Sequence, residues 1–378
     1  MTTTIIQMKE QAEKKFTELE LPTQNHGKGF ALNITVDWEK VFAEIQKAED
    51  AEIITDDAAK EKIKICKLSE LGEAFVAKYA QKLVPAENKL LALHYSVAAD
   101  ATVIIIPKNT VIENPIIINT TANLPVSAES IIVIAEEGSQ AIIVENATST
   151  KDAHYKSQVI QIYAHANAKI TYCTIYNETA GTHSFTTKRA EVLQDANIQW
   201  FDFSVGEGFT QVQLRSYLRE TGAASQQYQA IVGRNAQQAD LNSEVFHQKS
   251  KTNSAMLAKG ILSDKSRALH RGTIRVEKNA FNCQGDQRSD ILLLGNEARC
   301  NAIPVLEVEN DDVSCSHGTT MGQIDEEQLY YLLSRGLDEN IAKKMLVIAF
   351  VEPILQKIAN EKVREEIQNI IQERLERK

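Results

Sequence analysis

Four stretches of this chain place a small residue in front of a β-rich run: Ala141-Ile142-Ile143-Val144, Ala168-Lys169-Ile170-Thr171-Tyr172, Ala196-Asn197-Ile198-Gln199-Trp200 and Ala224-Ser225-Gln226-Gln227-Tyr228. Their alanines lie 27, 28 and 28 residues apart. A repeat of this length is typical of a parallel β-solenoid, in which each coil buries its inward side chains on the coil beneath. The pattern therefore predicts a mainly β fold with a solenoid core, and a Greek-key sandwich is the alternative.

The surrounding sequence has the same β character from about residue 98 onward. Short apolar runs at 103–106 and 131–134 follow one another, and no pattern long enough for a helix intervenes. This texture argues against alternating βαβ units. It continues to Val313, although the polar segment 216–248 has no clear assignment. We therefore expect the β core to span residues 96–322.

Helical patterns precede the β core. Apolar residues recur at helical spacing in two stripes, formed by Trp38, Val41, Phe42 and Ile45 and by Leu71, Phe75, Tyr79 and Leu83. Such stripes lie on one side of an α-helix and pack against a core. Pro22 and the glycines at 27 and 29 predict a break between helices. We expect a mostly helical N-terminal domain over residues 1–95.

The C-terminal part of the chain carries signals for three helices. Asp325 predicts the N-cap of a helix over residues 326–334, and Asp338 predicts the cap of a second helix. Pro353 ends or kinks that second helix. A last helix has an apolar stripe that packs either on its own domain or on a partner, and the stripe consists of Val363, Ile367, Ile370, Ile371 and Leu375. We expect a C-terminal helical domain over residues 323–378.

Composition excludes several classes of protein. The 378 residues include 43% hydrophobic side chains and carry a net charge of −10, without a basic cluster. These values suit a globular protein with a large core and argue against nucleic acid or anionic membrane as a partner. The longest apolar run, at 345–351, is far too short to span a membrane, and no secretory signal is visible. Five scattered cysteines without a CxxC pair favour a reducing cytoplasm.

Cys315 and His317 form the clearest candidate site. They lie two residues apart in an expected strand that ends at Gly318, so both side chains share one face. Thiolate and imidazole are both ligands for soft or borderline metals, and a thiolate can also carry a transferred sulfur. The alternative is that the cysteine is a small buried hydrophobe. Further ligands would be needed, and stacked coils could bring together four candidates in the same region, namely Cys283, Cys300, His247 and His270.

Motifs for nucleotide and hydrolase chemistry are missing from the sequence. It contains no GxxxxGK[ST], GxGxxG or GxSxG pattern. Asp286 with Asp290, and Glu307 with Glu309, have spacings compatible with glycoside chemistry, although most such pairs are solvated surface charges. A β-helix polysaccharide lyase or hydrolase therefore stays as one alternative. A structural homodimer without a metal role is the other.

The late β region contains an ordered series of motifs. They are His270-Arg271-Gly272-Thr273-Ile274-Arg275-Val276, Asp290-Ile291-Leu292-Leu293-Leu294, Pro304-Val305-Leu306-Glu307-Val308, Asp311-Asp312-Val313-Ser314-Cys315-Ser316-His317-Gly318-Thr319-Thr320 and Asp325-Glu326-Glu327-Gln328-Leu329-Tyr330-Tyr331-Leu332. In this order and spacing they resemble the SufB/SufD family of iron–sulfur cluster assembly proteins, over about residues 95–350. The resemblance implies a right-handed parallel β-helix with helical regions at both ends.

Within that family, the chain is similar to SufD. Its Cys-Ser-His-Gly run at 315–318 has the SufD form, whereas SufB-like chains carry Glu-His-Glu-Ala there. Ala298 stands where SufB-like chains carry the cysteine that receives sulfur. The resemblance therefore implies a non-catalytic scaffold subunit that does not receive sulfur by itself. The first 90 residues match the family only loosely.

The resemblance also implies partners and site residues. It implies pairing with a SufB-like paralogue and docking of a SufC-like ABC ATPase, and we expect a homodimer when the chain is isolated. No tightly bound cofactor is expected, because His317 and Cys315 would hold iron or an iron–sulfur cluster only transiently at the SufB–SufD interface. Iron would enter at this interface. The residues expected to face the ATPase are Gln328, Leu329, Tyr331, Leu332, Arg335, Met345 and Phe350.

Overall fold

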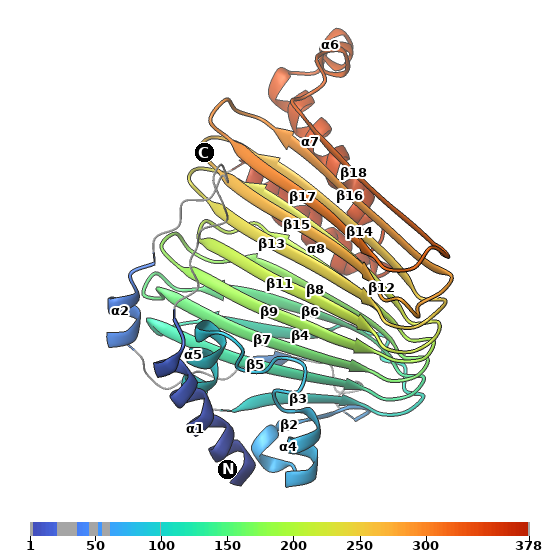
Figure 1. Ribbon diagram of the computed structural model, residues 1–378. Helices are drawn as coiled ribbons and strands as arrows, with labels where there is room; N and C mark the ends of the chain where they lie inside the picture. The colour runs from blue at the N-terminus through green and yellow to red at the C-terminus, as the bar shows by residue number, and fades with distance from the viewer. Residues whose placement is uncertain (1–2, 21–35, 45–51, 55–60, 99, 377–378) are drawn as a thin grey trace.

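The chain winds into a solenoid of two long sheets with helices at both ends (Figure 1). The structure is a computed structural model that describes residues 3–20, 36–44, 52–54, 61–98 and 100–376. The sheets take alternate strands along the chain, so each coil gives one strand to each sheet. The predicted mainly β solenoid is therefore confirmed.

Each sheet contains a row of parallel strands that begins with one short antiparallel strand. Sheet A contains, in spatial order, β1 (Glu52–Ile54), β4 (Ile116–Ala122), β6 (Gln140–Ser149), β8 (Lys169–Asn177), β10 (Asn197–Ser204), β12 (Ala224–Gly233), β14 (Asn253–Leu262), β16 (Cys283–Leu293) and β18 (Val313–Gly322). Sheet B contains β2 (Lys64–Lys67), β3 (Ala101–Ile106), β5 (Val126–Ala135), β7 (Tyr155–Ala164), β9 (His183–Val192), β11 (Phe209–Leu218), β13 (Gln238–His247), β15 (Arg267–Val276) and β17 (Arg299–Val308).

The strand pairing shows that two of the four alanines in the predicted repeat are not at equivalent positions. Ala168 and Ala196 are equivalent, because Lys169 pairs with Asn197, but Ala141 pairs with Ile170 and therefore lies two positions away. Ala223, not Ala224, occupies the third equivalent position, since Ala224 pairs with Asn197. The equivalent alanines are fully buried, at 0% exposure. Coil lengths differ by a few residues. Alanines that recur at a nearly constant spacing in the sequence therefore do not all occupy equivalent positions in the coils.

Tight turns explain why these alanines recur. Asn167 and Asp195, each one residue before an equivalent alanine, have positive φ angles of 60° and 53°. Asn and Asp tolerate this left-handed conformation better than most residues, and Gly222 fills the same place with a φ of 78°. The turn leaves little room for the next side chain, which points into the core. An Asn, Asp or Gly followed by alanine therefore marks each coil boundary in this part of the solenoid.

The N-terminal helices cover the outer face of sheet B along its first coils. Helix α1 (Thr3–Glu18) packs with α5 (Lys89–Val97) and α4 (Glu73–Tyr79) beside sheet B, and α2 (Trp38–Ala43) lies near them (Figure 1). The segment expected to be mostly helical also contains β1 and β2, which pair antiparallel with β4 and β3, and the short helix η1 (Leu68–Glu70). The predicted break near residues 22–29, and Ile45 of the first stripe, lie outside the described residues.

Side chains on the outer face of sheet B attach this N-terminal layer. Arg189 is buried and donates to the carbonyl of Leu83 at 2.6 Å, and it also pairs with Glu87. Gln161 accepts hydrogen bonds from the backbone N–H groups of Leu83 and Val84. The layer is therefore held by polar contacts as well as by apolar packing.

The C-terminal helices divide into a packed pair and an exposed arm. Helices α7 (Glu339–Leu355) and α8 (Glu361–Glu376) bury apolar side chains against the outer face of sheet A, where Val363, Ile367 and Ile371 are 1–3% exposed. The stripe of the last helix thus packs on its own chain. Helix α6 (Glu326–Ser334) has no buried residue and projects beyond the coils (Figure 1). Asp325 caps it as predicted, accepting from two backbone N–H groups.

The interior of the central coils contains a buried ion pair. Lys188 and Asp202 have side chains 0% and 1% exposed, and Nζ lies 2.5 Å from Oδ1. The ring centroids of Tyr172, Tyr176 and Trp200 surround Nζ at 5.2 to 5.6 Å. Aromatic faces attract a desolvated cation, and the carboxylate compensates its charge.

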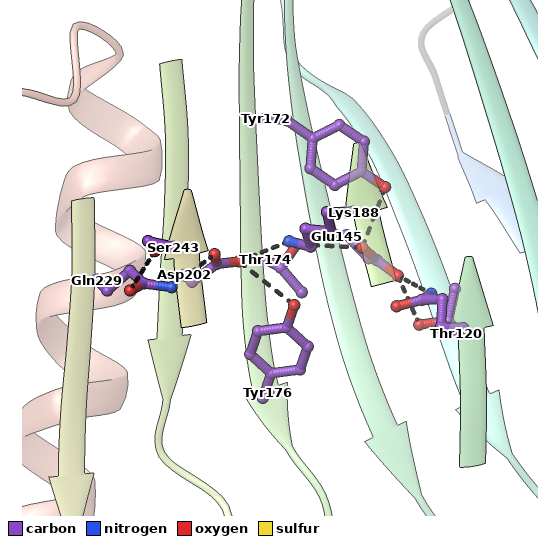
Figure 2. Close-up of polar contacts among 10 residues, drawn as sticks. Thr120, Glu145, Tyr172, Thr174, Tyr176, Lys188, Asp202, Gln229 and Ser243 are labelled. Carbon is purple, nitrogen blue, oxygen red and sulfur yellow. Dashed lines mark hydrogen bonds and ion pairs between the residues drawn. The ribbon is translucent and has the colours of Figure 1, made fainter. Parts of the chain in front are cut away.

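Hydrogen bonds extend this ion pair along the solenoid axis (Figure 2). Seven side chains, each bonded to the next at 2.5 to 3.4 Å, form what we call the polar file: Thr120, Glu145, Thr174, Lys188, Asp202, Gln229 and Ser243. The file crosses both sheets from β4 to β13. The interior of the solenoid is therefore mainly apolar but contains this row of hydrogen-bonded polar side chains. Each side chain of the polar file holds its neighbours in position.

Candidate functional site: the open end of the solenoid

The C-terminal end of the solenoid consists of β17 in sheet B and β18 in sheet A. In the described part of the chain each pairs on one side only, with β15 and β16 respectively. Their inward side chains therefore have no further coil to cover them. We call this surface the open end.

Strand β18 runs from Val313 to Gly322, beyond the predicted end at Gly318. That prediction was wrong because β16 provides a parallel partner as far as Leu292, which pairs with Gly322. The position of Gly318 is open, since no atom outside its chain neighbours would lie within 4 Å of a Cβ there, so the glycine leaves no gap in the packing. The strand therefore continues through the glycine that was expected to stop it.

Cys315 and His317 share the inward face of β18. They are in register with Gly285 and Gln287 of β16. Gln287 marks this face as inward, because its Nε2 reaches across the interior to the carbonyl of Gly272 at 3.1 Å. Cys315 packs at the margin of the interior apolar cluster, whereas His317 is exposed. The two donors therefore differ in access to solvent although they point the same way.

The environment of Cys315 keeps its thiol protonated near neutral pH. Burial raises the pKa of Cys315, and the neighbouring thiol of Cys283 raises it further. A thiol with a raised pKa is a weak nucleophile, but a bound metal cation displaces its proton. Cys315 is therefore suited to bind a cation rather than to attack a substrate.

Cys283 and His247 lie at the same lateral edge as Cys315. Thr252 links them, because its Oγ1 lies 3.2 Å from Sγ of Cys283 and 2.8 Å from Nδ1 of His247. The other ring nitrogen of His247 contacts Ser254 Oγ at 2.8 Å. Burial lowers the pKa of His247 to about 4, so the ring is neutral at pH 7. His247 is a hydrogen-bonded core residue in this arrangement.

Cys300 and His270 do not join this group. Strand β17 starts where β16 ends, so Cys300, its second residue, lies at the lateral edge opposite Cys315. Burial raises the pKa of Cys300 to about 12. His270 bonds Ser289 at 3.0 Å, and burial together with the nearby Arg271 lowers its pKa to about 4. The expected convergence of all the candidates is therefore not found.

The open end offers two potential metal donors rather than a complete site. Among the residues that the structure places, no three His, Cys, Asp or Glu side chains lie close enough together to hold a metal ion. Iron–sulfur clusters are bound mainly by thiolates and in some proteins by imidazoles, usually with four protein ligands. Cys315 and His317 match these donor types but not this number. A cluster at this end would need ligands from another chain.

Three of the four candidate carboxylates are engaged in other contacts. Asp290 is bonded to Lys259 at 2.7 Å and to Arg288 at 3.0 Å, and these cations lower its pKa against the effect of burial. Asp286 accepts from Ser316, and Glu307 pairs with Arg275. These contacts give the carboxylates structural partners on the outer faces of the sheets.

A second candidate surface lies on α6 and the start of α7. Its exposed apolar side chains include Tyr331 and Met345, which are 55% and 48% exposed. A groove of about 400 Å³ separates the helices, lined by Glu327, Gln328, Tyr331, Leu332 and Leu346. Phe350 lies apart from the groove, half-buried, with Lys259 Nζ 4.5 Å from its ring centroid. We call the residues around the groove the arm surface.

Sequence reasoning missed the residues that support the open end. Gln287 and Gly272 meet across the interior, and Gly285, in register with Cys315, lies so close to Ile274 that a Cβ atom there would be 3.1 Å from its side chain. A glutamine by itself does not reveal whether it points inward or outward. The flanking charged residues Asp286 and Arg288 were a usable signal, because charged side chains at alternate positions mark the outer face and place Gln287 on the inner one, as its burial shows.

Fold and site together define a β-solenoid protein whose candidate chemistry lies at an uncovered end and not in a groove along the coils. No helix in the described segments is long and apolar enough to cross a membrane. Residues 116–350 match the family described as SUF system FeS cluster assembly, SufBD core domain.

The chain belongs to the SufBD family of iron–sulfur cluster assembly proteins. It is similar to iron–sulfur cluster assembly SufBD family proteins of Staphylococcus saprophyticus, Staphylococcus epidermidis and Staphylococcus aureus. Each of the three is 28% identical over 367 residues, which cover 93% of this chain and 76% of the relative.

Proposed function

We propose that this chain is a SufD-like, non-catalytic scaffold subunit that acts in the cytoplasm. It pairs with a SufB-like paralogue and a SufC-like ABC ATPase to build and deliver iron–sulfur clusters. The observation that carries the proposal is the open end, where a thiol and an imidazole lie on the inward face of a last strand that no further coil covers in the described chain. Unpaired strand edges invite association with another chain. A paralogue docked there would cover the edges and add the missing ligands.

His317 and Cys315 are the proposed donors to iron or to the cluster, which is the cargo of the complex. Two donors from one chain bind more weakly than four, and weak binding suits a cluster that has to be passed on. His317 is the accessible member, so iron entry is assigned to it. Cys315 is half-buried and would join when the incoming metal displaces its proton, which passes to the solvent.

Anaerobic co-expression with SufB-like and SufC-like partners tests the donors. The H317A variant should form the same complex by size-exclusion chromatography but contain little iron and sulfide. Thr319→Ala is the matched control, because Thr319 is the next inward residue of β18, is also exposed, and offers no soft donor. Normal iron and sulfide in H317A, or an equal loss in T319A, would refute the assignment.

The arm surface is the proposed docking site for the ATPase. It joins exposed apolar side chains to a groove at the most projecting helix of the structure (Figure 1). Gln328, Leu329, Tyr331, Leu332, Arg335 and Met345 are the proposed contacts. Phe350 is a weaker candidate, since part of its surface is already packed against sheet A.

The open end also accounts for the proposed homodimer of the isolated chain. Val308 and Met321 are 42% and 44% exposed there. Without a paralogue, two copies would cover these side chains against each other. Replacing both by lysine should yield monomers by light scattering, because charged edges oppose strand pairing. A wild-type monomer at micromolar concentration would remove this part of the proposal.

A further inference from the structure

One buried amide beneath His317 has an unused hydrogen-bond acceptor. Gln287 is 1% exposed, and its Nε2 donates to the carbonyl of Gly272. Its Oε1 has no hydrogen-bond partner among the described residues. A buried polar atom without a partner is uncommon and costs about 1–3 kcal/mol. Such an atom one strand away from a candidate metal donor needs an explanation.

The neighbours of Gln287 in sheet A limit where a donor can come from. On one side Gln287 is in register with Met256, which carries no N–H or O–H. On the other side it is in register with His317, whose ring carries at least one N–H. Neighbouring strands lie about 4.8 Å apart, so in-register side chains on one face can reach each other. In this structure neither Oε1 of Gln287 nor the ring of His317 has a hydrogen-bond partner among the described residues, and a rotation of the exposed His317 side chain is what would bring its N–H to Oε1.

The amide is held in place from the opposite sheet. A Cβ atom on Gly272 would lie 2.5 Å from Nε2 and 2.8 Å from Cδ of Gln287, so only glycine leaves room for the amide. The bond from Nε2 to the Gly272 carbonyl also fixes which end of the amide is the acceptor. The oxygen, and not the NH2 group, is therefore the end of the amide that has no partner.

We propose that Gln287 is a positioning residue for His317. Its Oε1 accepts the N–H of one ring nitrogen, which leaves the other nitrogen unprotonated and directed at the metal. Histidines that bind metals usually donate their second ring N–H to such an acceptor, and losing the acceptor typically weakens metal binding 10- to 100-fold. The inference rests on the proposed role of His317 as a donor to iron.

The tautomer of His317 tests the contact directly. In full-length protein labelled with 15N at its eight histidines, H317A assigns the His317 signals. Wild type should show one dominant ring tautomer, and Gln287→Met, which keeps the volume but removes the acceptor, should show a mixture. Gly272→Ala, which displaces the amide from the other side, should do the same.

Gln227→Met is the matched control. Gln227 lies in the same column two coils away, since Met256 pairs with both residues, and it too is 1% exposed with an unpartnered Oε1. The Q227M substitution should leave the His317 signals unchanged. The proposal is overturned if Q287M and G272A leave the tautomer as in wild type, or if Q227M changes it equally.

A second readout separates this inference from the proposed function. Titration of the full-length chain with Co²⁺, a spectroscopic substitute for Fe²⁺, should show affinity at least 10-fold lower in Q287M than in wild type and Q227M. If the tautomer depends on Gln287 but H317A binds Co²⁺ like wild type, the contact stands and the proposed donor role fails. If Q287M retains both the tautomer and the affinity, the positioning role fails while His317 can still be a donor.

Discussion

Replacing Lys188 by methionine removes the cation from the polar file with little change in volume. Its Nζ donates to Asp202 Oδ1 and Thr174 Oγ1, each at 2.5 Å, in an environment 0–1% exposed. The carboxylate of Asp202 would keep only Tyr176 OH at 3.3 Å and Gln229 Nε2 at 3.4 Å. Both remaining donors are neutral, so the negative charge would be left uncompensated inside the core.

The magnitude follows from the burial of both partners. Breaking a buried ion pair from one side typically costs 3–5 kcal/mol, which is about a third or more of the stability of an ordinary domain. We expect K188M to lower the free energy of unfolding by about 4 kcal/mol. Removing both charges, in K188M with Asp202→Leu, should restore most of this loss, because neither charge then has to be desolvated.

Hydrogen exchange is the suitable assay, because solenoids can unfold in parts rather than in one step. Amides of β8 and β10 should lose protection in K188M, whereas those of β16 should change much less. Urea unfolding followed by circular dichroism gives the overall change. Lys169→Met is the control, since Lys169 is exposed at the start of β8, and it should stay within about 0.5 kcal/mol of wild type. A loss below about 1 kcal/mol in K188M, or no recovery in the double variant, would show that the pair is not the compensated charge described here.

Three further predictions concern other parts of the chain. Tyr331→Ser should weaken binding of the ATPase partner at least 10-fold by calorimetry, whereas the equally exposed but distant Val111→Ser should not. Burial lowers the pKa of His94 to about 3, so the folded state leaves it neutral while the unfolded chain protonates it below about pH 6.5. Stability should therefore fall from pH 6.5 toward pH 4, by up to about 1.4 kcal/mol per pH unit for this group, and urea unfolding of wild type and His94→Asn should differ in that slope. Burial raises the pKa of Cys173 far more than that of Cys66, so iodoacetamide at pH 8 should label Cys66 first and Cys173 only after unfolding, as mass spectrometry can show.

The solenoid could be predicted because its signal is local. The central coils repeat a turn residue with positive φ, a buried alanine and a β-rich strand, and all three lie within a short window of sequence. The frame was harder, since turns of unequal length shift the alanines by one or two positions. The strands β1 and β2 escaped prediction because they are short and interrupt helical patterns.

The polar segment 216–248 shows why the interior could not be predicted. It forms β12, β13 and the end of β11, and its inward side chains include Gln227, Gln229 and Ser243. A strand is recognised in a sequence by the alternation of apolar inward residues with polar outward residues. Polar side chains at inward positions remove that alternation. These residues are stable inside only because the neighbouring coils supply partners, and those partners are distant in sequence.

The candidate site was predictable to the same limited extent. The two-residue spacing of Cys315 and His317 places both on one face of a strand, and the structure shows that face. Whether Cys283 and Cys300 lie near them depends on the lateral edge at which each strand begins, which spacing alone does not reveal. Cys283 shares the edge of Cys315, and Cys300 occupies the other.

The edges at the two ends of the solenoid differ in length and direction. In the described chain β1 and β2 pair on one side only, as β17 and β18 do, but they are antiparallel strands of three and four residues, whereas β17 and β18 are parallel strands of ten residues. Very short edge strands resist pairing with another chain, so a solenoid with a long edge at one end only does not favour growth into a fibre. Under the proposed function, we therefore expect association through the open end to stop at a single counterpart.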